Sequence, residues 1–262
     1  MKKQRIDDWL VSHEYFDSVD EAKRFIMAGK VFNEHERIHS AAEKITPETV
    51  KIRVKGLNKK YVSRGGYKLE KALAAFNLDI QHKVHVDIGS STGGFTDCAL
   101  QNGALQSYAI DVGTNQLAYE LRIDPRVTVM EQTNFRYVTP EQFDPRPNFA
   151  TIDVSFISLG LIFKTLKTIL AEQAEVVALI KPQFEAERHE VGDKGIVTDP
   201  AVHYKVIQKV LALAQHDQFF PLALTTSPIK GAAGNTEYLV YLSNTPSDTE
   251  ITSDMIADVI AG

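Results

Sequence analysis

Two lysines and two acidic residues stand at places in the sequence where a catalytic site is expected. Asp153 and Lys181 each directly follow an apolar run that predicts a strand, and Glu237 opens the last such run. Lys68 lies in a predicted helix before the first strand of the sheet. Ligands of open α/β sheets bind beyond the carboxyl ends of the strands. If the last strand runs antiparallel to the others, all four side chains therefore converge at one edge of the sheet.

Two ammonium and two carboxylate groups suit methylation of a ribose hydroxyl, which must lie in line with a sulfonium methyl group and lose its proton as the bond forms. Burial and a neighbouring cation lower the pKa of a lysine from its ordinary value of about 10.4. We therefore assign Lys181 as the base, with Lys68 lowering its pKa and orienting the nucleophile. Asp153 and Glu237 then hold the two ammonium groups. Taken singly, each residue also has a structural interpretation, as a turn cap, an ion-pair partner, an exposed strand residue or a member of a basic run.

Residues 84–97 predict the site of a nucleotide-type cofactor, because an alternating strand at 84–88 runs into a glycine-rich turn and then a helix. Glycines permit a tight turn, and the free N–H groups at the start of the helix can anchor a polar ligand. A dinucleotide-binding turn has glycine where this chain has Ser91. S-adenosylmethionine carries no pyrophosphate, and a turn with Asp87 before it and Gly89 within it suits that cofactor better.

A second acid supports this interpretation. Asp111 ends the next predicted strand, 107–112, and comes 24 positions after Asp87 (111 − 87). This is close to the spacing of about 20 residues at which an acid meets the ribose hydroxyls in nucleotide-binding α/β folds.

Strand and helix patterns alternate through most of the chain, which predicts an α/β fold. Such alternation implies a seven-stranded, mostly parallel sheet covered on both faces, here with an antiparallel last strand. The predicted strands lie near 84–88, 107–112, 127–130, 149–153, 176–180, 221–226 and 237–242, and the helices between and after them near 94–102, 114–122, 158–171, 201–215 and 251–260. A further helix, containing Lys68, ends near Phe76.

The first part of the chain predicts a small α+β domain, residues 1–58, ahead of a methyltransferase domain, residues 59–262. Helical spacing at 5–10 and 19–27 is followed by short strands at 31–32 and 50–54. This module resembles the small RNA-binding domain shared by a small-subunit ribosomal protein and many pseudouridine synthases. The expected RNA contacts are cations of this module and of the basic strip at 51–71: Arg5, Lys23, Arg24, Lys30, Lys59, Lys60 and Arg64. The alternative to an RNA-binding role is that the basic strip at 51–71 is a connector exposed to solvent.

Composition narrows the class of protein. The net charge of −5 is unevenly distributed, because residues 1–60 carry 13 Lys+Arg against 10 Asp+Glu while the rest carry 16 against 24. No apolar run approaches the roughly 18 residues of a membrane span, and no secretory core follows the first residues. We therefore expect a cytoplasmic protein without a membrane partner. The single Cys98 excludes an internal disulfide and predicts a buried structural thiol, and no metal site is predicted.

Six motifs, spread over nearly the whole chain, resemble the TlyA group, often labelled hemolysin A, whose catalytic domain is similar to FtsJ-type ribose methyltransferases. The motifs are 63–69, 87–96, 111–117, 153–159, 181–185 and 234–237. The resemblance implies a Rossmann-like methyltransferase domain, S-adenosylmethionine as methyl donor, and 2′-hydroxyls of ribosomal RNA, typically of cytidine, as targets. It also implies a Lys-Asp-Lys-Glu tetrad at Lys68, Asp153, Lys181 and Glu237.

The resemblance further implies which residues contact the cofactor. They are Asp87, Gly89, Ser90, Ser91, Thr92, Gly93, Gly94, Phe95, Thr96, Asp111, Val112, Asn134, Phe135 and Asp153. Asn134 stands where FtsJ-type chains commonly have aspartate.

Other functions remain as alternatives to methylation of ribosomal RNA or of a ribosomal subunit. They are a membrane-damaging hemolysin, a non-catalytic RNA-binding ribosome-assembly factor, and a small-molecule O-methyltransferase. Amino methyltransferases fit less well, because Asp153 is not followed by a Pro-Pro-aromatic motif, and no cysteine lies near the predicted pocket to attack a pyrimidine ring. No protein partner is evident. Residues 191–198, which include two glycines, are a candidate mobile loop over the site.

Overall fold

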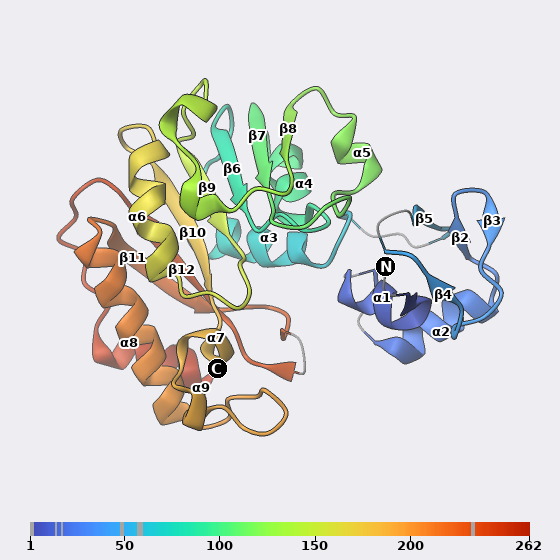
Figure 1. Cartoon of the computed structure of the whole chain (residues 1–262). Coiled ribbons are helices and arrows are strands. Elements are labelled where there is room, and N and C mark those ends of the chain that lie inside the picture. Colours follow the sequence, from blue (N-terminus) through green and yellow to red (C-terminus); the bar gives the residue numbers. More distant parts are fainter. Residues whose placement is uncertain (1–2, 14, 17, 48–49, 57–59, 232–233) are drawn as a thin grey trace.

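The computed structural model describes residues 3–13, 15–16, 18–47, 50–56, 60–231 and 234–262 (Figure 1). A seven-stranded sheet dominates it, with the strand order β11-β12-β10-β9-β6-β7-β8. The strands are β6 (Val84–Ile88), β7 (Gln106–Ile110), β8 (Val127–Met130), β9 (Phe149–Ile152), β10 (Glu175–Ile180), β11 (Phe220–Thr226) and β12 (Tyr238–Ser243). All seven lie close to the predicted positions.

The last strand is antiparallel to both of its neighbours, as predicted. β12 inserts between β10 and β11, and its pairing places Tyr238 opposite Ile180. Strands β6 to β10 pair in parallel. The start of β12 therefore lies at the same edge of the sheet as the end of β10, and this brings Glu237 and Lys181 to one place.

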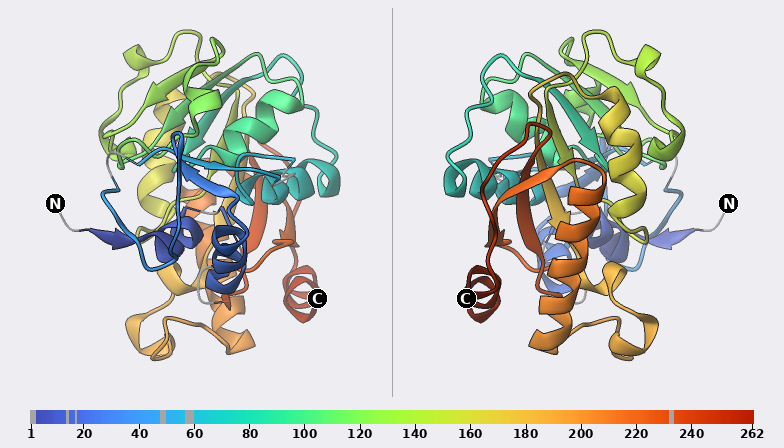
Figure 2. Two further views of the ribbon diagram at one scale, coloured as in Figure 1. Left: turned by 90° about the vertical axis from the view of Figure 1, so that its right-hand side faces the viewer. Right: turned by 90° about the vertical axis from the view of Figure 1, so that its left-hand side faces the viewer.

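Helices cover both faces of the sheet (Figures 1 and 2). Along β10, Val176, Ala178 and Ile180 belong to one apolar core and Val177 and Leu179 to the other, because successive side chains of a strand point to opposite faces. The first core includes residues of α6 (Gly160–Ile169), α8 (Pro200–His216) and α9 (Ser253–Ala261), and the second includes residues of α3 (Gly65–Ala75) and α4 (Gly94–Gln101). Cys98 is buried in the second core, as predicted.

One predicted helix is largely wrong. The helix expected over 114–122 is reduced to α5 (Tyr119–Arg122). Asn115 has a left-handed backbone, with φ of 54°, which interrupts a helix. The Glu131 carboxylate accepts hydrogen bonds from the backbone N–H groups of Asn115, Gln116 and Leu117 at 2.8–3.1 Å. These groups are thus satisfied without a helix.

The N-terminal part has a core of its own and forms a separate unit beside the sheet (Figure 1). It contains α1 (Ile6–Ser12), α2 (Val19–Met27), paired strands β1 (Gln4–Arg5) and β4 (Lys44–Ile45), and a sheet of β3 (Glu36–Arg37), β2 (Val31–Asn33) and β5 (Ile52–Val54). The Ser18 side chain caps α2 by accepting a hydrogen bond from Glu21 N at 3.2 Å. The predicted boundary between residues 58 and 59 lies outside the described residues.

Within the part of the chain that the structure describes, no helix is both long enough and apolar enough to traverse a bilayer.

Candidate active site

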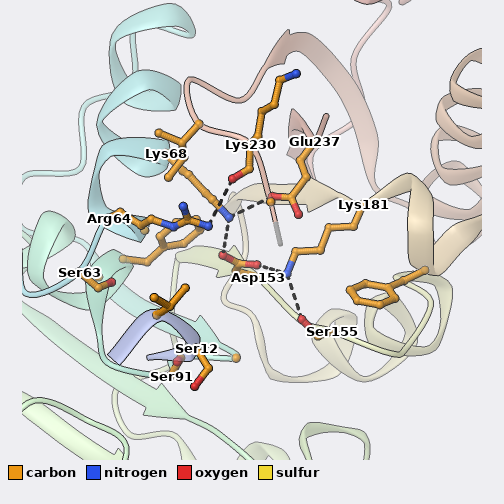
Figure 3. A pocket seen from close by; sticks show the side chains of 18 of the residues that line it. Ser12, Ser63, Arg64, Lys68, Ser91, Asp153, Ser155, Lys181, Lys230 and Glu237 are labelled. Carbon is orange, nitrogen blue, oxygen red and sulfur yellow. Dashed lines mark hydrogen bonds and ion pairs between the residues drawn. The ribbon is translucent and has the colours of Figure 1, made fainter. Parts of the chain in front are cut away.

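The four predicted catalytic residues meet in one cluster, which we call the quartet: Lys68, Asp153, Lys181 and Glu237 (Figure 3). Lys68 Nζ donates to Asp153 Oδ2 at 3.2 Å and to Glu237 Oε2 at 3.1 Å. Lys181 Nζ lies 2.5 Å from Asp153 Oδ1. Asp153 therefore bridges the two lysines, and the two positive and two negative charges cancel.

The quartet is nearly inaccessible to water. Side-chain exposure is 4% for Lys68, 2% for Glu237, 10% for Lys181 and 16% for Asp153. A buried charge is tolerated only when it is paired and hydrogen-bonded. Burial by itself raises the pKa of Asp153, but the charges of Lys181 and Lys68 outweigh burial and bring that pKa below its ordinary value. Asp153 thus remains ionised between the lysines.

Close packing of two helices sets the position of Lys68. A Cβ atom on Gly94, at the start of α4, would lie 2.4 Å from Ser63 Oγ and 2.8 Å from Gly66 N. A Cβ atom on Gly66 would lie 2.3 Å from the ring of Tyr61. Only glycine fits at these two positions. The first turn of α3, and with it Lys68, is consequently held against the cofactor turn.

Two further side chains hold the quartet, and the sequence analysis missed both. Lys181 Nζ donates to Ser155 Oγ at 3.2 Å, and Gln183 Nε2 donates to Glu237 Oε1 at 3.2 Å. Ser155 follows Asp153 by two positions, and Gln183, in α7 (Pro182–Glu185), follows Lys181 by two. A search for polar residues two positions beyond each strand-end residue would have found them.

Asp87 is a buried carboxylate at the floor of the predicted cofactor site. Its Oδ2 accepts hydrogen bonds from Thr96 N at 2.9 Å and Thr96 Oγ1 at 2.7 Å, and its Oδ1 accepts from Thr151 Oγ1 at 3.1 Å. Burial raises the pKa of Asp87 to about 7, against the opposing effect of these donors. The ionisation of Asp87 is therefore sensitive to a positive charge brought next to it.

A chain of buried hydrogen bonds continues from Asp87 into the sheet. Thr151 Oγ1 lies 2.8 Å from His85 Nε2, and His85 Nδ1 lies 2.9 Å from Ser107 Oγ. Burial lowers the pKa of His85 to about 3, so the imidazole is neutral. Because the Thr151 hydroxyl donates to Asp87, His85 Nε2 must carry the proton and Nδ1 must accept from Ser107. Each donor in this series of hydrogen bonds therefore points toward Asp87.

The glycine-rich turn contains three residues with a left-handed backbone, a conformation that glycine adopts readily. Ser91 has φ of 48°, Gly89 of 83° and Gly93 of 95°. A Cβ atom on Gly89 would lie 2.5 Å from Asp153 O, so this glycine lets the turn approach the end of β9. Asp111 accepts hydrogen bonds from Ser91 N at 2.9 Å and Gly113 N at 2.7 Å, which ties the turn to the end of β7.

A pocket of about 930 Å³ joins the cofactor turn to the quartet. Of the predicted cofactor residues, it is lined by Asp87, Gly89, Ser90, Ser91, Gly94, Phe95 and Asp153. The other seven do not line it: Thr92, Gly93, Thr96, Asp111, Val112, Asn134 and Phe135. The residues present suit S-adenosylmethionine, because two carboxylates, Asp87 and Asp153, face a pocket large enough for a ligand with a cationic sulfonium and a cationic ammonium group.

The outlying cofactor residues have different surroundings. Phe135 is buried in the apolar core, whereas Val112 is 71% exposed beyond β7. The Asn134 side chain accepts a hydrogen bond from Arg136 N at 3.1 Å. A Cβ atom on Gly93 would lie 2.3 Å from the side chain of Leu121, so this glycine allows α5 to pack against the turn.

Part of the pocket wall comes from the N-terminal unit. Asp8, Val11 and Ser12 of α1 and Val19 of α2 line it, as do Phe156 and Phe184, whose ring centroids lie 4.8 Å apart. Residues 191–198 do not line it. Asn235 holds that segment instead, because its side chain accepts from Val197 N at 3.0 Å and donates to Gly195 O at 2.9 Å.

The structure separates the predicted RNA contacts. Arg64 lines the pocket and donates to Lys230 O at 3.3 Å (Figure 3). Three others are paired with acids: Arg5 with Asp7, Lys23 with Asp20 and Lys60 with Glu70. Arg24 and Lys30 line a separate hollow of about 300 Å³. Lys59 lies outside the described residues.

The chain is similar to known proteins over most of its length. The sequence profile of the FtsJ-like methyltransferase family matches residues 61–244. A candidate rRNA methyltransferase of Bacillus subtilis, YqxC, is 52% identical over 242 residues, which are 92% of this chain and 86% of that protein. The Mycobacterium tuberculosis protein named 16S/23S rRNA (cytidine-2′-O)-methyltransferase TlyA is 36% identical over 259 residues, or 99% of this chain and 96% of that protein. A solved structure of a candidate hemolysin from Streptococcus thermophilus is 48% identical and superposes with a TM-score of 0.82, covering 100% of this chain and 95% of that one.

Proposed function

The chain belongs to the FtsJ-like methyltransferase family, and on that premise we propose that it transfers the methyl group of S-adenosylmethionine to a ribose 2′-hydroxyl of ribosomal RNA. The observation that carries the proposal is a buried quartet with two lysines in the same pocket as the Asp87 turn. Cytidine is the proposed target nucleoside, because relatives from Mycobacterium tuberculosis and Campylobacter jejuni are named as cytidine-2′-O-methyltransferases.

The chemistry of the quartet follows from its contacts. Bound S-adenosylmethionine supplies a methyl group on a cationic sulfur. Lys68 contacts two carboxylates, whereas Lys181 contacts one carboxylate and the Ser155 hydroxyl. Lys181, with a single carboxylate partner, is the lysine that we assign as the base, and as a neutral amine it accepts the proton of the ribose hydroxyl.

The remaining members of the quartet orient the reacting groups. Lys68 is locked between Asp153 and Glu237, so it can donate a hydrogen bond to the 2′-oxygen while remaining charged. That donor stabilises the negative charge that develops on the oxygen as its proton leaves. Asp87 and Asp153 line the same pocket and would hold the cationic groups of the cofactor.

The proposal is tested by transfer of labelled methyl from S-adenosylmethionine to ribosomal subunits that lack the modification. Wild type is compared with Lys181→Ala and with Lys205→Ala, an exposed lysine of α8 that pairs with Glu190. Wild type and Lys205→Ala should place label on RNA at an alkali-resistant linkage, and Lys181→Ala should be slower by a factor on the order of 100 to 10,000.

Binding of S-adenosylhomocysteine, measured by calorimetry, separates loss of chemistry from loss of the cofactor site. It should be unchanged in Lys181→Ala. Wild-type protein that binds the cofactor but labels neither subunit would contradict the proposed substrate. Equal label from wild type and Lys181→Ala would contradict the role of Lys181.

A further inference from the structure

The sheet of the N-terminal unit turns one face to the N-terminal core and the other to solvent. Val31 of β2 is fully buried in that core, and side chains alternate along a strand, so Phe32 points to the solvent face. Phe32 pairs with Arg37 of β3 on one side and with Arg53 of β5 on the other. An Arg-Phe-Arg row therefore crosses the outer face of this sheet.

Further cations extend the row. The Nζ atom of Lys55 lies 4.8 Å from the ring centroid of Phe32, and the guanidinium carbon of Arg53 lies 5.1 Å from it. Lys55 N donates to Lys30 O at 2.7 Å, and Lys30 Nζ lies 5.2 Å from the ring centroid of Phe25. These contacts connect the outer face of the sheet to α2. We call this surface the basic–aromatic face: Arg24, Phe25, Lys30, Phe32, Arg37, Arg53 and Lys55.

Arg37 and Arg24 complete the connection to α2. A Cβ atom on Gly29, just after α2, would lie 2.4 Å from the guanidinium carbon of Arg37, so Arg37 reaches back over the end of that helix. Arg24, Phe25 and Lys30 line the 300 Å³ hollow, together with Glu21. The face is therefore one continuous surface with a hollow at one end.

The five cations of this face keep their charge available. Within the described part of the chain, none of Arg24, Lys30, Arg37, Arg53 and Lys55 takes part in an ion pair. All five are exposed. A cation that is not neutralised by its own chain can replace the counterions of a phosphate backbone, which is the main source of affinity for nucleic acid.

The acids of the adjoining turn and strand do not face this surface. Glu34 forms an ion pair with Lys51 at 2.8 Å. Glu36 pairs with Asn33, so its side chain lies on the opposite side of the sheet from Phe32. The outer face of the sheet consequently presents positive charge and an aromatic ring without an adjacent carboxylate.

We propose that the basic–aromatic face binds unpaired nucleotides of the RNA substrate, with bases stacked at Phe32 and Phe25 and phosphates at the surrounding cations. The inference rests on the proposed function and deepens it by naming the surface that holds the substrate. Half-buried rings flanked by guanidinium and ammonium groups suit bases that are free of pairing, because a double helix hides the faces of its bases. Phe25 also packs against Phe16 of the N-terminal core, with ring centroids 4.9 Å apart.

The experiment measures binding of full-length protein to a labelled single-stranded RNA and to an RNA hairpin duplex of equal length. The variants are Arg53→Gln/Lys55→Gln and Phe32→Leu, a smaller apolar residue that keeps the strand. Lys51→Gln is the matched control, since Lys51 also adjoins β5 but is paired with Glu34. Amide hydrogen exchange at Ile26 and Val31, which are buried in the N-terminal core, should match wild type in all variants and so show that this unit is folded. Affinity for S-adenosylhomocysteine should also be the same, which shows that the cofactor pocket is intact.

The double variant should bind single-stranded RNA about tenfold more weakly at 0.1 M salt, and the slope of log affinity against log salt should fall by about 1.4. Phe32→Leu should weaken single-strand binding about fivefold and leave duplex binding unchanged. Lys51→Gln should change the affinity for single-stranded RNA and for duplex RNA by less than about twofold.

Unchanged single-strand affinity in the double variant would overturn the proposal. Equal losses on single strand and duplex in Phe32→Leu would overturn the stacking of unpaired bases. The methyl-transfer assay distinguishes these results from failure of the proposed function. If wild type binds single-stranded RNA through this face but labels no ribosomal RNA, only the proposed function is contradicted. If wild type methylates ribosomal RNA but wild type and the double variant bind RNA with equal affinity, the proposed basic–aromatic face is contradicted and the proposed function is not.

Discussion

The quartet and the basic–aromatic face use the same residue types in opposite ways. In the quartet, lysine charges are buried and balanced by two carboxylates within 3.2 Å. On the basic–aromatic face, lysine and arginine charges are exposed and have no acid partner among the described residues. The first arrangement holds a proton at a defined atom, and the second attracts a polyanion. Whether a cation serves chemistry or binding thus depends on its neighbours rather than on its type.

The largest effect should come from breaking the charge balance of the quartet. Lys68→Met keeps most of the volume of the side chain but leaves Glu237 buried without its cation. We expect the free energy of unfolding to be about 3 to 5 kcal/mol lower than in wild type, because an uncompensated buried charge is strongly destabilising. Methyl transfer should be abolished. Urea denaturation and a single-turnover assay measure the two effects.

Lys205→Met is the control on an exposed ion pair, with Glu190. It should change stability by less than about 1 kcal/mol. A Lys68→Met protein as stable as this control would show that the quartet does not depend on charge balance.

A smaller effect is expected in the buried hydrogen-bond chain beneath the cofactor turn. Thr151→Val keeps the shape of the side chain but removes the hydroxyl between Asp87 and His85. The His85 N–H loses its acceptor and Asp87 loses a donor. We therefore expect the free energy of unfolding, measured by urea denaturation, to fall by about 1 to 3 kcal/mol. Thr168→Val, at an exposed hydroxyl that donates to Thr165 O, should be nearly neutral. Equal stability of the two variants would contradict the role of the chain.

The pH dependence of stability should report on Asp87. Its pKa of about 7 lies above the ordinary value of 3.8, so between these values the folded protein holds a proton that the unfolded chain has lost. Stability contributed by Asp87 is therefore complete below about pH 4 and falls as the pH rises to about 7, by at most about 1.4 kcal/mol per pH unit. Asp153, whose pKa is lowered, acts in the opposite sense and loses its contribution only in stronger acid. Urea denaturation from pH 4 to 8 should show the fall in wild type but not in Asp87→Asn.

The smallest effect should come from a cation that the structure finds neutralised. Lys23 lies 3.7 Å from Asp20, one turn away on α2. Lys23→Gln should reduce RNA affinity by less than about twofold, because its charge is already balanced. A loss as large as that of Arg53→Gln/Lys55→Gln, in the same binding assay, would erase the distinction between paired and unpaired cations.

Lys181 and Glu237 were expected to meet on the condition that the last strand runs antiparallel, and the structure meets that condition. Once 176–180 is a parallel strand and 237–242 an antiparallel one, Lys181 and Glu237 must share an edge of the sheet. The loop at 114–118 was not predictable, because the carboxylate that accepts hydrogen bonds from its N–H groups belongs to Glu131, which follows β8. Local patterns carry no information about such a partner.

The surface available to bind RNA was harder to predict for a related reason. Positive charge along a sequence indicates a basic surface, but it does not show which cations have an acid beside them in space. Lys60 meets Glu70 ten positions later, while Arg53 and Lys55 of the same basic strip meet an aromatic ring instead. Arg64, from that strip too, points into the pocket. Pairing depends on the fold, so the binding surface could be assigned only from the structure.

The insertion of β12 between β10 and β11 also means that the quartet is completed by a strand from near the end of the sequence. Lys68, Asp153 and Lys181 all precede β11 in the chain, whereas Glu237 arrives with the strand that links β11 to the rest of the sheet. Until β12 enters that gap, Lys68 lacks one of its two carboxylates and the sheet lacks its edge. A nascent chain that has not passed β12 therefore carries three of the four residues and no finished site. Completion of the quartet therefore depends on the last strand to join the sheet.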